Sequence, residues 1–204
     1  MLYISKAGHV ECSWIRVEIC KNIERGIMKE VNGIVVHQTA AAKISSTFNS
    51  YANPGAHGAH FLIDKTGEIY QTASLYKVTN HVGYLQSRCV VTTKCSQTEL
   101  KHALILEKLS PRDVMAKAVH ASEKPKLFPD RYPSNADSIG IEIVGDAIGP
   151  KNKEIFEPVT DMQNSSLQWL IKELTQTLGV SMQEIYRHPR VGRKNETEAS
   201  TAKW

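Results

Sequence analysis

The sequence predicts a single α/β domain in which a mixed central β-sheet is flanked by helices. Two short β-branched runs, at residues 33–38 and 138–145, are typical of buried strands. Residues 162–178 place apolar side chains at helical spacing and predict a helix that packs on such a sheet. A chain of 204 residues with 41% apolar residues is long enough to bury one sizeable core.

The first half of the chain predicts strands, a hairpin and a short helix. Residues 14–30 mix apolar and charged positions and fit either a helix or a strand followed by a helix, because Gly26 interrupts both patterns. The strand at 33–37 ends on His37, and residues 43–52 form a short amphipathic helix. Residues 60–64 and 68–71 flank a glycine-containing turn and predict a β-hairpin.

The segment of about 85–133 is polar and basic and interrupts the strand pattern. We interpret it as an insertion near the mouth of the site, with helices near 97–108 and 111–121. Residues 1–32 are predicted to be an N-terminal extension packed on the domain, and residues 33–204 to be the domain itself.

Charge and hydropathy exclude two classes of partner. The net charge of +4 favours contact with a polyanion, but it is too small for a nucleic-acid-binding protein. No stretch approaches the roughly 20 apolar residues of a membrane span. Charged residues interrupt the N-terminal segment, so we expect no signal peptide.

Four cysteines form two local pairs, Cys12 with Cys20 and Cys89 with Cys95. Neither pair has the spacing of a zinc knuckle or a redox motif. A disulfide-closed loop at Cys89 and Cys95 fits an oxidising compartment, and two free thiols fit equally well.

Two histidines suggest a metal site. His37 ends a rigid strand, and His188 lies in a loop that also contains Glu196 and Glu198. Zinc hydrolases use three protein ligands and leave a fourth position for water. The two histidines and one of the two glutamates satisfy that number, whereas the alternative makes the histidines core residues.

Glu142 lies in the middle of the apolar run IGIEIVG. An ionised carboxylate among Ile and Val costs several kcal/mol unless it is paired or used in chemistry. We expect it to act as a general base and then a general acid. In the alternative interpretation it points to solvent from an edge strand.

These segments together resemble the zinc amidases that include phage amidase-type lysozymes, bacterial anhydro-muramyl-peptide amidases and animal peptidoglycan recognition proteins. Six pieces match in the family's order and span most of residues 33–204: IVVHQTA at 34–40, GAHFLIDKTGEIYQ at 58–71, NHVG at 80–83, NADSIGIEIVG at 135–145, the helix at 162–178, and RHPRVGRKNETEAS at 187–200.

The resemblance implies a role for individual residues. His37 and His188 match the first two zinc ligands, and Glu142 matches the catalytic acidic residue of bacterial members. Lys194 matches the lysine that stabilises the oxyanion, and His81 a histidine of the substrate groove.

The third ligand has two candidates. The family's spacing from Lys194 selects Glu196, whereas the ten-residue span from His188 selects Glu198. We predict Glu198, with Glu196 as the alternative. We also expect His60 to contact substrate, and note that Ala59 stands where some members have Tyr.

The function implied is hydrolysis of the amide bond between N-acetylmuramic acid and L-alanine in peptidoglycan, with Zn²⁺ as cofactor. Without a signal peptide, the protein needs host lysis or a secretion machine to reach the periplasm or cell wall of a target bacterium. We expect an antibacterial effector of the type VI kind with a cognate immunity protein. The alternatives are a phage endolysin and a non-catalytic peptidoglycan-binding module.

Overall fold

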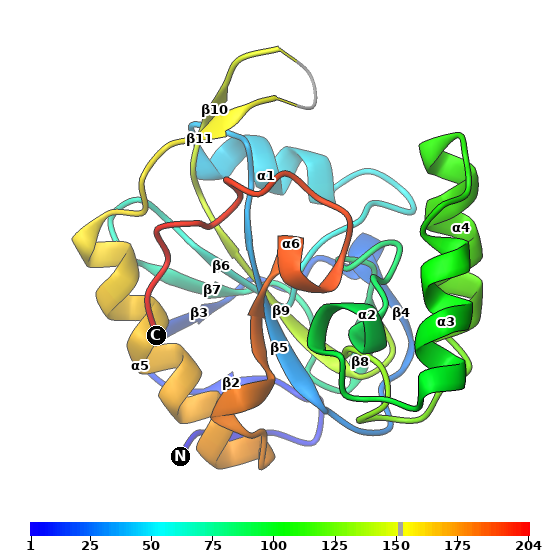
Figure 1. Ribbon diagram of the computed structural model, residues 1–204. Helices are drawn as coiled ribbons and strands as arrows, with labels where there is room; N and C mark the ends of the chain where they lie inside the picture. The colour runs from blue at the N-terminus through cyan, green and yellow to red at the C-terminus, as the bar shows by residue number, and fades with distance from the viewer. Residues whose placement is uncertain (151–152) are drawn as a thin grey trace.

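The computed structural model describes residues 1–150 and 153–204, and it confirms the α/β class with a mixed central sheet. The six strands of this sheet are ordered β12-β5-β9-β6-β7-β3 (Figure 1). All neighbouring pairs are parallel except β6 and β7, which form the expected antiparallel hairpin. The strands are β3 (Ile15–Val17), β5 (Gly33–Gln38), β6 (Phe61–Ile63), β7 (Ile69–Gln71), β9 (Ser138–Ile143) and β12 (Ile185–Arg187).

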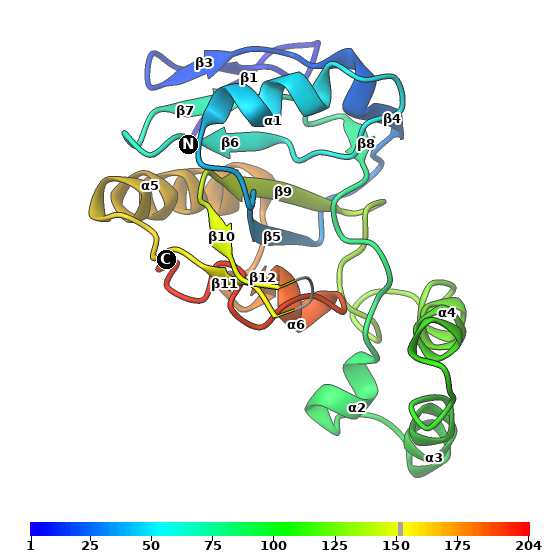
Figure 2. The same cartoon turned by 90° about the horizontal axis from the view of Figure 1, so that it is seen from above.

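Two helices cover opposite faces of the sheet. Figure 2 shows α1 (Ile44–Tyr51) in front of the sheet and α5 (Asp161–Leu178) behind it. The side chain of Thr160 caps the first turn of α5, and Gly179, with a φ of 70°, ends the helix. The apolar side of α5 buries Leu167, Leu170, Ile171 and Leu174 in the main core.

Strand alternation divides the side chains of β5 and β9 between the two faces. Ile34 and Val36 join the main core with α5. Val35 packs in a second cluster on the opposite face, with Val82, Leu85, Tyr132 and Val191. His37 follows the parity of Val35, and Glu142 lies beside it in the register of the two parallel strands. Both side chains therefore belong to the face opposite α5.

The N-terminal residues 14–30 form strands and a 3₁₀ turn. Strand β3 pairs with β7 at the edge of the central sheet, and β4 (Glu24–Ile27) pairs with β8 (Lys77–Thr79). The 3₁₀ turn η1 (Lys21–Ile23) joins them. Of the two alternatives, the strand at the start of this segment is present, but no helix of α type follows it. A small hairpin of β1 (Tyr3–Ile4) and β2 (Val10–Glu11) precedes them.

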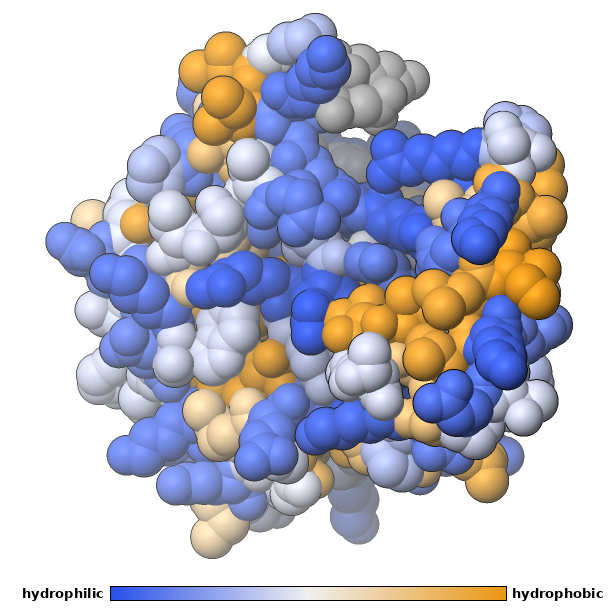
Figure 3. Space-filling model, viewed as in Figure 1, coloured by the Kyte–Doolittle hydropathy of each residue, from blue (hydrophilic) through white to orange (hydrophobic). Residues whose placement is uncertain are grey.

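The segment of about 85–133 contains α2 (Arg88–Thr92), α3 (Gln97–Leu106) and α4 (Arg112–Glu123). In Figure 2, α3 and α4 project away from the sheet. The structure bonds Cys89 to Cys95, with Cα atoms 5.4 Å apart, which favours the disulfide over two free thiols. Figure 3 shows an apolar surface over this part of the molecule, where Leu104, Ile105 and Val114 are exposed.

The remaining elements lie near the C-terminal segment. They are β10 (Ala147–Ile148), β11 (Ile155–Phe156), η2 (Met182–Glu184) and α6 (His188–Val191). Within residues 1–150 and 153–204, no helix combines the length and apolar character that a bilayer crossing requires.

Candidate active site

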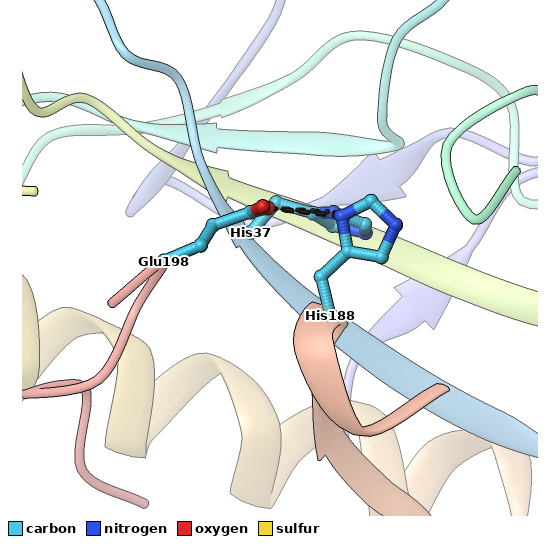
Figure 4. Close-up of side chains that lie close together, drawn as sticks. All are labelled: His37, His188 and Glu198. Atoms are coloured by element: carbon cyan, nitrogen blue, oxygen red, sulfur yellow. Dashed lines mark hydrogen bonds and ion pairs between the residues drawn. The ribbon is translucent and has the colours of Figure 1, made fainter. Parts of the chain in front are cut away.

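Three side chains meet above the carboxyl end of β5. His37 comes from β5, His188 from the start of α6, and Glu198 from the C-terminal loop, and Figure 4 shows them pointing toward one another. The Nδ1 atoms of His37 and His188 are 2.8 Å apart. Glu198 Oε1 lies 2.9 Å from His188 Nδ1 and 3.5 Å from His37 Nδ1. All three residues are buried.

Backbone carbonyls fix which nitrogen of each ring carries the proton. His188 Nε2 lies 2.8 Å from the carbonyl oxygen of Val82, and only an N–H can make that hydrogen bond. His81 Nε2 lies 3.3 Å from the carbonyl oxygen of Ser138, so His81 Nδ1 is left as an acceptor for His37 Nε2, 2.9 Å away. In their neutral forms, His37 and His188 therefore both present an Nδ1 lone pair to Glu198.

This set of donors fits a metal ion. Two lone pairs and a carboxylate oxygen converge, and they repel one another unless a proton or a metal ion lies between them. Zinc–nitrogen and zinc–oxygen bonds of about 2.0–2.1 Å in a tetrahedral site separate the ligands by roughly 3.3 Å. The observed separations of 2.8, 2.9 and 3.5 Å bracket that value. The Nε2–H of His188 donates to a backbone carbonyl, an arrangement that is also typical of metal-bound histidines.

The ionisation of the cluster suits ligation at neutral pH. Burial and the neighbouring His188 lower the pKa of His37 to about 4, so its ring is neutral. Burial alone would raise the pKa of Glu198, but a proton that lies between its carboxylate and the rings of His188 and His37 makes hydrogen bonds that outweigh burial and lower the pKa to about 2. A neutral imidazole and an ionised carboxylate are the metal-binding forms of these groups.

Glu142 lies on the same face as this cluster and beside His37 in the strand register. Its strand is central, between β5 and β6, which contradicts the interpretation of an edge strand facing solvent. The Oε2 atom is buried and has no hydrogen-bond partner among the described residues. Burial, followed by the charge of Glu198, raises the pKa of Glu142 to about 8. A carboxyl group with a raised pKa and an unused oxygen is equipped to accept and return a proton.

A cleft of about 900 Å³ opens onto these residues. His37, His188, Glu198, Glu142 and Lys194 all contribute to its wall. A second cavity adjoins it and shares Lys194 and Glu198, among other residues. Glu198 therefore lies on the wall that the two cavities share.

The structure separates the two candidates for the third position. Glu198 is buried against both histidines, whereas Glu196 is exposed and lines only the second cavity. Lys194 is exposed at the wall that both cavities share. Glu198 thus joins the histidines, and Glu196 does not.

The two expected substrate histidines occupy different positions. His60 is fully buried, and its ring donates to the carbonyl of Lys77 and accepts from the backbone N–H of Gly140, so it has no surface for the contact that we expected. His81 lines the cleft, but both of its ring nitrogens form hydrogen bonds within the protein, Nδ1 with His37 and Nε2 with the carbonyl of Ser138. The burial of His60 could not be predicted, because sequence order does not reveal which side of a short segment faces the core; a role of His81 in substrate binding stays a prediction.

Asn135 is a residue that the sequence analysis missed. Its side-chain oxygen accepts from the backbone N–H groups of His81 and Val82, at 2.9 and 2.7 Å. It thereby holds the segment that supplies partners to both histidines of the centre. Its place at the start of the matching piece NADSIGIEIVG is the one signal that singles it out in the sequence.

Comparison with known proteins identifies the family. The sequence matches the family model described as N-acetylmuramoyl-L-alanine amidase over residues 28–200. The chain belongs to this family. Comparison with curated proteins gave no match.

Solved structures share the fold of this chain. The catalytic domain of XlyA is 22% identical, with a TM-score of 0.51 over 88% of this chain and 87% of that one. A selenomethionine derivative of AmpD is 15% identical, with a TM-score of 0.52 over 93% and 88%. AmpDh3 from Pseudomonas aeruginosa, in complex with an anhydromuramic pentapeptide, is 17% identical, with a TM-score of 0.53 over 94% of this chain and 58% of that one.

Proposed function

We propose that the protein is a zinc-dependent amidase that hydrolyses the bond between N-acetylmuramic acid and the L-alanine of the stem peptide. The convergence of His37 Nδ1, His188 Nδ1 and Glu198 Oε1 is the observation that carries this proposal. Membership of the amidase family supports the substrate class, and so does the structure of AmpDh3, a protein of similar fold, in complex with an anhydromuramic pentapeptide.

Each residue of the site has a separate role in the proposed reaction. His37, His188 and Glu198 would hold zinc, which when bound supplies a Lewis acid that activates water and polarises a carbonyl. Glu142 accepts the proton that the attacking water gives up, and then delivers it to the departing alanine nitrogen. The Lys194 ammonium group, at the wall of the cleft, donates to the carbonyl oxygen as it becomes negative.

Digestion of purified peptidoglycan, followed by mass spectrometry, tests this proposal. Free stem peptides that begin with L-alanine, together with unsubstituted glycan, are the expected products. EDTA should abolish the release, and added zinc should restore it. Full activity in metal-free protein would refute the zinc mechanism, and stable binding without cleavage would favour the non-catalytic binding module.

We also propose that the protein acts as an antibacterial effector in the periplasm of a target cell. The Cys89–Cys95 disulfide supports an oxidising compartment. Expression directed to the periplasm of a test bacterium should cause lysis, whereas cytoplasmic expression and periplasmic Glu142→Gln should not. An immunity protein in the producing cell should suppress this lysis. Lysis that no protein of the producer suppresses would favour the phage endolysin.

A further inference from the structure

One side of helix α4 lines the cleft along the length of the helix. Arg112, Ala116, His120 and Lys124 follow one another at intervals of four residues, so they share one helix face. His120 and Lys124 border the cleft that holds the centre, and Arg112 and Ala116 border the adjoining cavity. The segment of about 85–133 therefore supplies a wall of the cleft.

Side-chain contacts at the C-terminal end of α4 fix the position of this wall. Lys126 pairs with Glu99 of α3 at 2.6 Å and with the buried Glu123 at 2.7 Å. His120 Nδ1 accepts the backbone N–H of Leu85 at 3.2 Å, which puts the proton of the neutral ring on Nε2. The Nε2–H of His120 therefore has no hydrogen-bond acceptor within residues 1–150 and 153–204.

No carboxylate of residues 1–150 and 153–204 pairs with the Lys124 ammonium group. Unlike the side chain of Lys126, the side chain of Lys124 forms no hydrogen bond or ion pair with the described part of the chain. Glu142 and Glu198 are the only carboxylates that line this cleft within residues 1–150 and 153–204, and both belong to the centre. The other residues that line this cleft are neutral or cationic, whereas Asp113 of α4 lines the adjoining cavity. An unneutralised ammonium group beside hydrogen-bond donors is a site for an anion.

Peptidoglycan offers such an anion on one side of the cleaved bond only. The stem peptide carries ionised carboxylates, whereas the hydroxyl and acetamido groups of the glycan are uncharged. We propose that Lys124, with His120 Nε2–H beside it, binds a carboxylate of the stem peptide. This inference rests on the proposed function, and it directs the peptide along α4 with the glycan on the other side of the centre.

Two synthetic muramoyl peptides test the inference. They share the same glycan unit and peptide length, and one has free carboxylates where the other has amides. Wild type should have the lower KM for the free acid. Lys124→Ala should raise that KM about three- to tenfold, the range of an exposed charge-assisted contact, and should change the KM for the amide less than about twofold.

Three controls separate charge from structure. Lys124→Arg should keep the preference for the free acid, because the charge remains. Lys101→Ala removes an exposed lysine of α3 that lines neither cavity, and should change neither KM. Zinc content and Tm of Lys124→Ala should equal those of wild type, and high salt should reduce the preference in wild type.

The outcomes distinguish this inference from the proposed function. Equal KM values of wild type for the two substrates, or an equal rise of both KM values in Lys124→Ala, would overturn the role of Lys124. If wild type cleaves neither compound, the proposed function fails. The dissociation constants of both compounds for Glu142→Gln, with and without Lys124→Ala, then still decide the inference: a preference for the acid that requires Lys124 supports it, and equal constants overturn it.

Discussion

Replacing Glu198 by Gln removes one negative charge from the candidate centre and keeps the shape of the side chain. In the structure, Glu198 Oε1 lies 2.9 Å from His188 Nδ1 and 3.5 Å from His37 Nδ1, so one metal ion could bind all three atoms. Changes to groups that only support a metal ligand typically lower metal affinity 10- to 100-fold. Loss of a direct carboxylate ligand should exceed that range, which corresponds to more than about 2.7 kcal/mol.

The same substitution should leave the metal-free protein almost as stable as wild type. The new amide N–H can donate to an Nδ1 lone pair, and one such hydrogen bond contributes about 1 kcal/mol. The unfolding free energies of the two metal-free proteins should therefore agree within about 1 kcal/mol. Zinc at 100 times its Kd should stabilise wild type by about 2.7 kcal/mol, or about 5–10 °C in Tm, and should not stabilise the variant.

Zinc content after dialysis, calorimetric titration and thermal unfolding measure these effects. Glu196→Gln is the matched control, because it makes the same chemical change in the same loop at an exposed position. It should retain zinc. If Glu196→Gln loses zinc and Glu198→Gln keeps it, the assignment of the third ligand is wrong; if both keep it, the cluster of three residues is not the metal site.

Three further predictions concern other groups. Glu142→Gln should keep its zinc and lose about 10²- to 10⁴-fold in rate, which single-turnover kinetics would measure; an unchanged rate would place the proton transfer elsewhere. Burial lowers the pKa of His60 to about 4 from its ordinary value near 6.5, so the stability that its neutral ring contributes is present above pH 6.5 and is lost as the pH falls toward 4. Urea unfolding should show that wild type loses about 2 kcal/mol more than His60→Gln between pH 7 and pH 5, and equal losses would contradict the pKa. Reduction of the Cys89–Cys95 bond should lower the unfolding free energy by about 2 kcal/mol, as expected for a short closed loop, and should have no effect on a Cys89→Ser/Cys95→Ser variant.

The sheet and its position relative to the site could be predicted because strand alternation is a local rule. The β-branched run at 33–38 is typical of a buried strand, and in a strand parity alone puts His37 on the face opposite Val36. The same rule puts Glu142 opposite Ile141 and Ile143. What the sequence could not supply was that β5 and β9 are neighbours, which brings His37 beside Glu142.

The N-terminal segment shows where local rules fail. Residues 14–30 have no clear period, and Gly26 weakens both a helix and a strand. The structure uses Ile15–Val17 as an edge strand because β7 offers a free edge, a tertiary contact that no local pattern records. Sequence spacing alone also left Glu196 and Glu198 unresolved, because only the path of the loop determines which carboxylate returns to the histidines.

Two glycines of the matched motifs, Gly140 and Gly192, leave space beside the histidines of the candidate metal site. A Cβ at Gly140 would lie 2.8 Å from His81 Nδ1, closer than real Cβ atoms approach, so any side chain there would displace the ring that accepts from His37. A Cβ at Gly192 would likewise lie 2.7 Å from the carbonyl oxygen of Val82, the acceptor of His188. In the sequence, Gly140 has the pattern of an ordinary strand position and Gly192 that of a loop residue. In the structure both act in the same way, because each leaves space for the hydrogen bond that orients one histidine of the candidate metal site.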